Sequence, residues 1–449
     1  MNKIRWGDGK PGIGPNLGPG FSTMDKKPGE KNYQIFKTTF LLMHLNKHFC
    51  CGNVWQCFDL SPHPPRRGNE KGAAMRSTVY FADMRAGHRE NLFGKLERLL
   101  EEAGIEGIVA RGNLTAIKIH FGEKGGHAYI RPTFLRRVVD RVKSLGGKPF
   151  LTDSCTLYPG ERKEAVSALT CGIENGFAYA VAGAPLIMCD GLRGHSARRV
   201  AIAGEILNQV EIGDAILEAD ALITVSHFKC HELTGFGGAL KNLGMGCSSR
   251  QGKLEQHSNV APQVAEKFCT ACAACLKACV HDAITFIEGK ARIDPDKCAG
   301  CGRCITVCQE KAIQIQWNEG PPQVMKKMAE YALGALHGKE GKKLFVNFIT
   351  QLSPACDCYG HTDAPIVADI GIAVSTDPVA LDQACADLVN AAPGLPGTAL
   401  QNGAEPGGDK FRGVHPDIDW EITLAHGEKI GVGRREYDLV KLEPKGKGW

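Results

Sequence analysis

Residues 269–279 read Cys-Thr-Ala-Cys-Ala-Ala-Cys-Leu-Lys-Ala-Cys, and residues 298–308 read Cys-Ala-Gly-Cys-Gly-Arg-Cys-Ile-Thr-Val-Cys. Each stretch holds four cysteines spaced C-x2-C-x2-C-x3-C, and the second follows the first at an offset of 29 residues. The same offset relates Ala283-Ile284 to Ala312-Ile313. The duplication therefore includes packing residues as well as cysteines, as expected for two halves of one small folded unit.

The cysteine spacing is typical of ferredoxin segments that hold two [4Fe–4S] clusters. Three thiolates within seven residues can bind neighbouring irons of one cubane, whereas the fourth begins a helix that carries it to the other cluster. The expected ligands of cluster I are Cys269, Cys272, Cys275 and Cys308. The expected ligands of cluster II are Cys298, Cys301, Cys304 and Cys279.

Two other uses of these cysteines fit the spacing less well. Structural zinc takes four ligands in all, usually as two separated cysteine pairs, and a doubled run of four exceeds that need. Disulfides are disfavoured because C-x-x-C pairs in an intracellular chain indicate metal or redox chemistry. One departure from the ferredoxin pattern is that Val280 and Gln309 replace the proline that usually follows the last cysteine.

Composition and charge exclude several classes of protein. The chain has 449 residues, 43% of them hydrophobic and 23% charged, which is ordinary for a globular protein of two or three domains. It has no apolar run of about 18 residues, so we expect no membrane span and a cytoplasmic location. Residues 75–449 hold 43 Lys and Arg against 44 Asp and Glu. This balance gives no basic footprint for nucleic acid.

Residues 1–74 differ from the remainder, with 11 Lys and Arg against 5 Asp and Glu. Eleven of the first thirty residues are Gly or Pro, which predicts a disordered extension. Three cysteines in this segment, Cys50, Cys51 and Cys57, lack the ferredoxin spacing. Because an apolar strand follows Met75 at once, we expect either a natural start at Met75 or a genuine disordered tail.

Apolar runs and amphipathic stretches alternate after Met75, which predicts an α/β fold with a mostly parallel sheet flanked by helices. Strands are expected at 78–83, 115–121, 148–153, 221–226, 343–349 and 367–374. Helices are expected at 89–104, 132–145, 212–219, 322–337 and 377–392.

The cysteine segment, residues 261–317, interrupts the α/β pattern. The simplest organisation is one α/β domain formed by residues 75–260 and 318–449, with a small ferredoxin-like α+β domain inserted at 261–317. The alternative is two separate α/β domains flanking the cysteine segment.

Polar side chains gather where three predicted strands end, in residues 118–123, 152–155 and 226–232. Ligands of open α/β sheets bind beyond the carboxyl ends of strands, although such residues also cap helices. Our candidate catalytic residues are His120, Asp153, His227, Lys229 and Lys241, with Cys247 as a further candidate group.

A glycine-rich stretch, residues 235–246, precedes Cys247. It matches neither the P-loop nor the G-x-G-x-x-G pattern. Its glycines can admit an anion beside Lys241 and Arg250, or can serve a tight turn and a close helix–sheet contact.

Cys356-Asp-Cys358 presents two sulfurs close together. With Cys247, or with His227 and His231, these cysteines could hold a third metal. Alternatively, they are buried cysteines that behave as small hydrophobic side chains.

Several stretches together resemble the domain-of-unknown-function 362 family, in its version with an inserted two-cluster ferredoxin module. The resemblance covers about residues 75–445, and family members begin near Met75. Relatives usually have Gly where Cys230 stands, and Cys155 is not typical of them. The matching stretches are 79–84, 118–123, 227–232, 235–247, 356–360, 363–367 and 377–380.

The resemblance implies electron transfer and leaves the reaction open. Our leading hypothesis is an iron–sulfur protein that relays low-potential electrons and works with a redox partner protein. A second hypothesis is an oxidoreductase, because small ferredoxins need no large α/β scaffold. A third is a redox sensor or an assembly factor.

Overall fold

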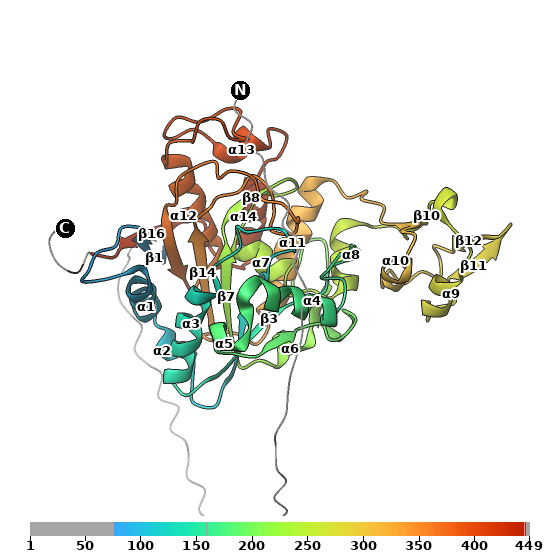
Figure 1. Ribbon diagram of the computed structural model, residues 1–449, viewed down its shortest axis with the longest axis horizontal. Coiled ribbons are helices and arrows are strands. Elements are labelled where there is room, and N and C mark those ends of the chain that lie inside the picture. Colours follow the sequence, from blue (N-terminus) through green and yellow to red (C-terminus); the bar gives the residue numbers. More distant parts are fainter. Residues whose placement is uncertain (1–75, 159, 444, 446–449) are drawn as a thin grey trace, which may run out of the picture. The chain divides into compact units, whose positions relative to one another are not determined.

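The computed structural model describes residues 76–158, 160–443 and 445 (Figure 1). The predicted extension at 1–74, with its three cysteines, and the predicted start at Met75 lie outside these residues.

Eight strands of the described chain form one sheet, in the order β16-β1-β15-β14-β7-β2-β3-β4. Strand β15 runs antiparallel to β1 and β14, and the other neighbouring strands pair in parallel. The mostly parallel sheet predicted from the sequence is therefore confirmed. The strands are β1 (Ser77–Asp83), β2 (Leu114–Lys118), β3 (Lys148–Asp153), β4 (Leu186–Met188), β7 (Ala221–His227), β14 (Lys343–Ile349), β15 (Gly371–Ser375) and β16 (Tyr437–Lys441).

Segments from both sides of the cysteine segment share this sheet. Strand β14 follows the cysteine segment in sequence and pairs in parallel with β7, which precedes it, with Val346 opposite Val225. The two α/β segments thus build one sheet rather than two.

The sheet is buried on both faces, as its apolar strands require. Along β14, Leu344 and Val346 pack into one hydrophobic core, and Phe345 and Ile349 pack into the other. Helices cover both faces (Figure 1). They include α1 (Leu92–Glu102) and α3 (Pro132–Ser144), and α7 (Ala239–Gly244), α11 (Pro321–Ala335) and α12 (Pro378–Ala391).

Proline and aspartate fix the helix starts that the sequence predicted. Pro132 and Pro378 occupy the first positions of α3 and α12, where a missing N–H costs nothing. The Asp377 carboxylate caps α12 by accepting hydrogen bonds from the N–H groups of Val379 and Ala380.

Three predicted elements differ from the structure. The predicted helix at 212–219 divides into strand β6 (Gln209–Gly213) and the short helix α6 (Asp214–Glu218), because Ile212 faces the core from a hairpin with β5 (Ala197–Ala201). The strands predicted at 115–121 and 367–374 are shorter, being β2 and β15.

Short elements complete the α/β part. They are α2 (Ile105–Ile108), α4 (Ala165–Gly172), a π-helical turn (Ile173–Phe177), α5 (Tyr179–Ala182), β8 (Lys229–His231), β9 (Gly235–Gly237), α8 (Arg250–His257), α13 (Lys410–Val414) and α14 (Glu421–Lys429).

The cysteine segment repeats its backbone conformation at the offset found in the sequence. Left-handed φ angles recur in the pairs Ala271/Gly300, Ala273/Gly302 and Asp282/Lys311. The left-handed backbone conformation costs an alanine about 1–2 kcal/mol, so the surrounding structure holds these loops in an energetically unfavourable conformation. The segment contains β10 (Gln263–Val264), a 3-10 turn (Glu266–Phe268), α9 (Ala274–Ala278), β11 (Ile284–Ile287), β12 (Lys290–Ile293), α10 (Arg303–Val307) and β13 (Ile313–Gln314).

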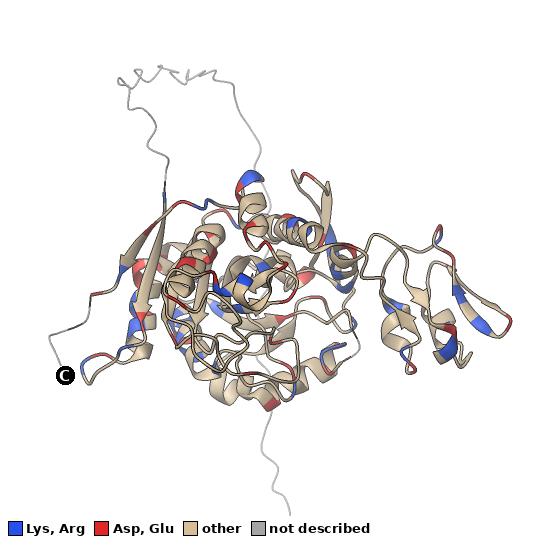
Figure 2. Cartoon of the chain, turned by 90° about the horizontal axis from the view of Figure 1, so that it is seen from above, with Lys and Arg blue, Asp and Glu red and all other residues tan. Residues whose placement is uncertain are grey.

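Basic and acidic residues are interspersed among the helices and loops visible in Figure 2. This mixture accords with the nearly equal numbers of both kinds after residue 74. Within the described residues, no helix combines the length and the apolar character needed to cross a membrane.

Asp382 provides a test of how α7 is held. Its buried carboxylate accepts hydrogen bonds from Ala239 N, Leu240 N and Asn347 Nδ2 at 2.7, 2.9 and 2.7 Å. Asp382→Ala leaves these buried donors unpaired, so we expect a loss of about 3 kcal/mol in the free energy of unfolding, measured by urea denaturation. The exposed control Asp438→Ala should change it by less than about 0.5 kcal/mol, and an equal effect of both variants would contradict this role.

Candidate functional site

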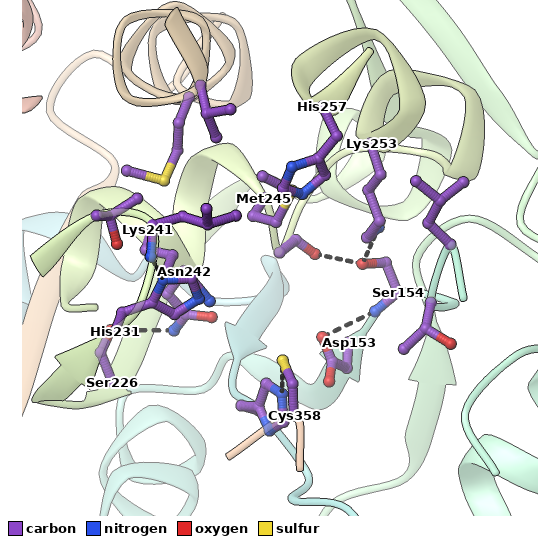
Figure 3. Close-up of a pocket in the computed structure, with 18 of the residues that line it drawn as sticks. Asp153, Ser154, Ser226, His231, Lys241, Asn242, Met245, Lys253, His257 and Cys358 are labelled. Carbon is purple, nitrogen blue, oxygen red and sulfur yellow. Dashed lines mark hydrogen bonds between the residues drawn. The ribbon is translucent and has the colours of Figure 1, made fainter. Parts of the chain in front are cut away.

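A cavity of about 420 Å³ lies where the carboxyl ends of β2, β3 and β7 meet (Figure 3). Its lining includes all five candidate catalytic residues, which the structure thus brings together. Further side chains come from α7, α8 and α11. The candidates are His120, Asp153, His227, Lys229 and Lys241.

A buried ionic network forms the floor of the cavity. Lys118 Nζ lies 2.9 Å from Asp153 Oδ1 and 2.7 Å from Asn242 Oδ1. Arg162 contacts Asp153 at 3.4 Å and Glu123 at 3.1 Å. Burial alone would raise the pKa of Asp153, but the positive charges of Lys118 and Arg162 outweigh burial and hold this pKa below its ordinary value.

Backbone hydrogen bonds set the tautomers of two histidines. His120 Nδ1 accepts from the N–H of Gly122 at 3.0 Å, so its Nε2–H points to Cys358 Sγ at 3.3 Å. His231 Nδ1 accepts from the N–H of Leu233 at 3.1 Å, which leaves its Nε2–H as a donor in the cavity lining. Burial lowers the pKa of His231 to about 3, so this ring is neutral.

His227 has acceptors at both ring nitrogens. Nδ1 lies 2.9 Å from Asp357 Oδ1, and Nε2 lies 2.8 Å from the carbonyl oxygen of Thr350. Lys229 Nζ contacts the same carboxylate at 3.1 Å. His227 therefore positions Asp357, and both of its nitrogens are occupied, which leaves none for a metal.

Cys356 and Cys358 meet beside the cavity. Lys241 Nζ lies 3.4 Å from Cys356 Sγ, and the N–H of Cys358 lies 3.4 Å from the same sulfur. A hydrogen bond from the Cys358 side chain lowers the pKa of the Cys356 thiol to about 5, with help from Lys241 and against the effect of burial. Cys358 itself lines the cavity.

Cys247 lies apart from these two thiols. Its sulfur contacts the carbonyl oxygen of Asn242 at 3.8 Å within the hydrophobic core, and burial raises its pKa to about 11. In the described parts of the chain, no three His, Cys, Asp or Glu side chains are placed to hold one metal ion. The predicted third metal site at Cys247, Cys356 and Cys358 is therefore not assembled, because Cys247 packs as a small hydrophobic side chain.

The glycine-rich stretch serves close packing. A Cβ on Gly244 would lie 2.1 Å from the carbonyl oxygen of Met328, and one on Gly238 would lie 2.3 Å from Asp382 Oδ1. Arg250, considered above as an anion partner, donates to the carbonyl oxygens of Thr156, Arg193 and Lys163 instead.

Sequence reasoning missed several lining residues. Tyr158 donates to the carbonyl oxygen of Cys358 at 3.2 Å and accepts from Arg162 at 3.0 Å. Lys253 donates to Ser154 Oγ at 2.8 Å, as Figure 3 shows. The only sequence signal for Tyr158 and Arg162 was their place in the loop after β3. The missed lining residues are Tyr158, Arg162, Lys253, His257 and Trp317.

The cysteine segment contains a hollow of its own, lined by all four predicted ligands of cluster I: Cys269, Cys272, Cys275 and Cys308. The N–H of Ala312 donates to Cys308 Sγ at 3.2 Å. Hydrogen bonds from the backbone of Ala291 and Ala271 lower the pKa of Cys269. A hollow lined by four thiols with backbone donors fits a [4Fe–4S] cluster.

The other four cysteines also approach one another across the repeat. Burial raises the pKa of the Cys298 thiol, and negative charge on Cys301 and Cys279 acts in the same direction. Cys279 comes from the first run and the other two from the second, which fits the crossed ligand sets predicted from the sequence.

One short segment touches both the cavity and the cysteine segment. Leu157 packs in the same small core as Ile305 and Cys275, and a Cβ on Gly302 would lie 3.4 Å from Leu157 Cδ1. Residues 156–158 also line the cavity. Leu157, in the loop after β3, therefore lies between the cavity and Gly302 of the second cysteine run.

Known proteins match parts of this chain. A family model described as Domain of unknown function (DUF362) matches residues 115–387. A ferredoxin of Pyrobaculum islandicum is 31% identical over 102 residues, which are 22% of this chain and 88% of the ferredoxin. One component of an ion-translocating oxidoreductase complex from Methanosarcina acetivorans is 42% identical over 53 residues, 12% of this chain. The chain spans 20% of that component's length.

Two solved structures share a distant likeness with the chain. The lactate racemase apoprotein of Thermoanaerobacterium thermosaccharolyticum gives a TM-score of 0.29 at 12% identity, over 61% of this chain and 51% of the racemase. A Thermotoga maritima protein gives 0.32 at 10% identity, over 76% of this chain and 58% of that protein. The fold class follows from the sheet of this chain itself.

Paired cysteine substitutions test the crossed ligand sets. We expect Cys272→Ser/Cys308→Ser to damage one cluster and to keep about half of the iron, because both residues belong to the same set. The matched variant Cys272→Ser/Cys279→Ser should damage both clusters. Iron per chain, measured after anaerobic reconstitution, distinguishes the two, and a greater iron loss in Cys272→Ser/Cys308→Ser than in Cys272→Ser/Cys279→Ser would show that the sets are not crossed.

Lys118→Met tests the ionic floor. Removing the ammonium leaves Asp153 buried with less compensating charge, so we expect a loss of about 3–5 kcal/mol in the free energy of unfolding and a higher pKa of Asp153. The exposed control Lys124→Met, which breaks a surface pair with Glu174, should cost less than about 1 kcal/mol. Chemical denaturation at neutral pH measures the free energy of unfolding of both variants. A loss for Lys118→Met as small as that for Lys124→Met would contradict the organising role of this network.

Proposed function

The chain belongs to the family described as Domain of unknown function (DUF362), and on that premise we propose that it is an iron–sulfur oxidoreductase. In this proposal the cysteine segment holds two [4Fe–4S] clusters, and a small molecule bound in the cavity of the α/β domain is reduced. The protein receives its electrons from a redox partner protein in the reducing environment of the cytoplasm.

The cysteine segment supports the first part of this proposal. The four-thiol hollow, the repeated left-handed loops and the likeness to a ferredoxin all fit cluster binding. When bound, the clusters supply one-electron storage, at potentials set by hydrogen bonds to sulfur and by solvent exposure. The residues for cluster I are Cys269, Cys272, Cys275 and Cys308, and those for cluster II are Cys298, Cys301, Cys304 and Cys279.

The second part of the proposal, reduction of a small molecule in the cavity, is supported mainly by segment 156–158, which lies against both the cysteine segment and the cavity. Leu157 packs against the cysteine segment, while Thr156 and Tyr158 line the cavity beside it. A dedicated electron carrier needs no such cavity. A reductase, in contrast, needs its substrate close to its electron source and shielded from bulk water.

The lining indicates what the cavity binds. Five cationic side chains line it, Lys118, Arg162, Lys229, Lys241 and Lys253, together with the acidic Asp153 and Glu232. Glu123, Asp357 and the Cys356 sulfur balance three of these cations from behind the lining. The N–H groups of the cations that face the cavity favour a ligand with carboxylate oxygens, which accept charge-assisted hydrogen bonds. The neutral His231 ring offers its Nε2–H as a fixed hydrogen-bond donor to such a ligand.

Exposed apolar side chains on the cysteine segment support a protein partner. Phe268, Leu276 and Val280 are 46%, 41% and 60% exposed and flank cysteines of the first run. Exposed apolar groups around a redox centre are typical of surfaces that bind a partner.

Cluster reoxidation tests the proposed function. Anaerobic protein is photoreduced and mixed with a low-molecular-weight cell extract, and the visible absorbance of the clusters is followed. We expect reoxidation in the wild type and in the exposed control His337→Ala, and slowing on the order of a hundredfold in His231→Ala, with iron content unchanged. If only a protein partner reoxidises the clusters, the chain is an electron carrier and the reductase proposal is wrong.

A further inference from the structure

Two cysteines outside the ferredoxin pattern share a turn at the cavity wall. Cys356 is 1% exposed and lies beneath Cys358, which lines the cavity. The N–H of Cys358 donates to Cys356 Sγ at 3.4 Å, and the Cys358 side chain hydrogen-bonds to the same sulfur. The two sulfurs are therefore neighbours, one accessible from the cavity and one behind it.

Both sulfurs have groups that stabilise a thiolate. Lys241 Nζ lies 3.4 Å from Cys356 Sγ, and His120 directs its Nε2–H at Cys358 Sγ from 3.3 Å. Cationic and hydrogen-bonding neighbours of this kind are what make cysteines reactive, and the low pKa of Cys356 agrees with them. Tyr158 fixes the turn through the carbonyl oxygen of Cys358.

Other cysteines of the α/β part have a different environment. Each is buried, and burial raises the pKa of its thiol, as expected of inert cysteines that pack as small hydrophobic groups. These cysteines are Cys155, Cys171, Cys189, Cys230, Cys247 and Cys385.

We propose that Cys356 and Cys358 form a redox-active dithiol that reduces a small anionic disulfide bound in the cavity. The inference rests on the proposed function for its electron supply, and it names the substrate class of the same site. Cys358 is the catalytic residue that meets the substrate, Cys356 resolves the intermediate, and Lys241 and His120 are positioning residues.

The substrate is reduced in two successive thiol–disulfide exchange reactions. Cys358 passes its proton to the Cys356 thiolate and attacks one substrate sulfur, so that a mixed disulfide forms and the other substrate half leaves as a thiolate. That thiolate takes the proton back from Cys356. The Cys356 thiolate then attacks Cys358 Sγ, which releases the second half as a thiolate and forms the Cys356–Cys358 disulfide. Two electrons and one proton restore the thiolate and the thiol, the electrons coming from the reduced iron–sulfur clusters of the proposed function.

The charge of the cavity selects among disulfides. The cavity lining holds five cationic hydrogen-bond donors, which favours a disulfide bearing carboxylates over one bearing ammonium groups. Dithiodipropionate and cystamine are matched probes of this difference, because both are short, symmetric disulfides of opposite charge.

The test uses the full chain, anaerobic, with its clusters loaded but oxidised and its thiols reduced, so that the clusters cannot return a disulfide to thiols. One equivalent of dithiodipropionate is added, and peptides are analysed by mass spectrometry after alkylation of the remaining thiols. We expect a disulfide between Cys356 and Cys358, a loss of two hydrogens, and release of two mercaptopropionates. Cystamine should react severalfold more slowly.

Variants assign the roles of the two sulfurs. Cys356→Ser should stop at a mixed disulfide on Cys358, and Cys358→Ser should lose the reaction. Lys241→Met should shift the alkylation profile of Cys356 to higher pH, an effect that a purely structural lysine would not produce. The control Cys171→Ser, which changes a buried thiol outside the cavity lining, should react like the wild type.

The inference is overturned if both cysteines remain free thiols after the disulfide is added, or if metal analysis finds a metal ion held by them. Exchange requires no clusters, so it separates this inference from the proposed function. If the Cys356–Cys358 disulfide forms but photoreduced clusters do not return it to thiols, the dithiol is supported and the proposed electron supply is wrong.

Discussion

A single buried lysine connects the elements on which the cavity depends. Lys118, 1% exposed, ends β2 and contacts Asp153 at the end of β3 and Asn242 in α7. Asn242 in turn donates to the carbonyl oxygen of Val225 and to Ser226 Oγ in β7. Three strand ends and one helix are thus joined by ionised and hydrogen-bonded groups away from water, where such contacts are strong and an unpaired partner is costly.

This network also holds the loop after β3, which forms one wall of the cavity. Arg162 adds a second cation to Asp153 and reaches Tyr158, which holds the turn of Cys358. The turn of Cys358, the residue that we propose to react, is therefore connected to buried charged groups. The cysteine segment meets this wall of the cavity through Leu157, in the same loop.

Much of this arrangement could be predicted from the sequence, because strand ends in a parallel sheet meet at one edge. His120, Asp153 and His227 follow predicted strands, and all three line the cavity. The spacing alone predicts crossed cysteine sets, and the four thiols predicted for one of them, Cys269, Cys272, Cys275 and Cys308, line one hollow. The conformations of 271/300 and 273/302 show that the duplication extends to the backbone.

Other parts could not be predicted, because they depend on tertiary packing. Lys253 and His257 come from α8, whose place above the cavity has no local signal in the sequence. Cys247 was grouped with Cys356 and Cys358 as a metal ligand, yet it packs in the core, and a cysteine serves either purpose with the same side chain. The sequence predicts a helix from Ile212, whereas pairing with β5 in a hairpin makes this residue part of strand β6.

The central claim is that electrons held in the cysteine segment reach the cavity through the wall formed by residues 156–158. Anomalous scattering at the iron edge from anaerobic crystals tests it most directly. The account predicts two iron clusters, one among Cys269, Cys272, Cys275 and Cys308 and the other beside Leu157. A single cluster, or iron bound at Cys356 and Cys358, would contradict it.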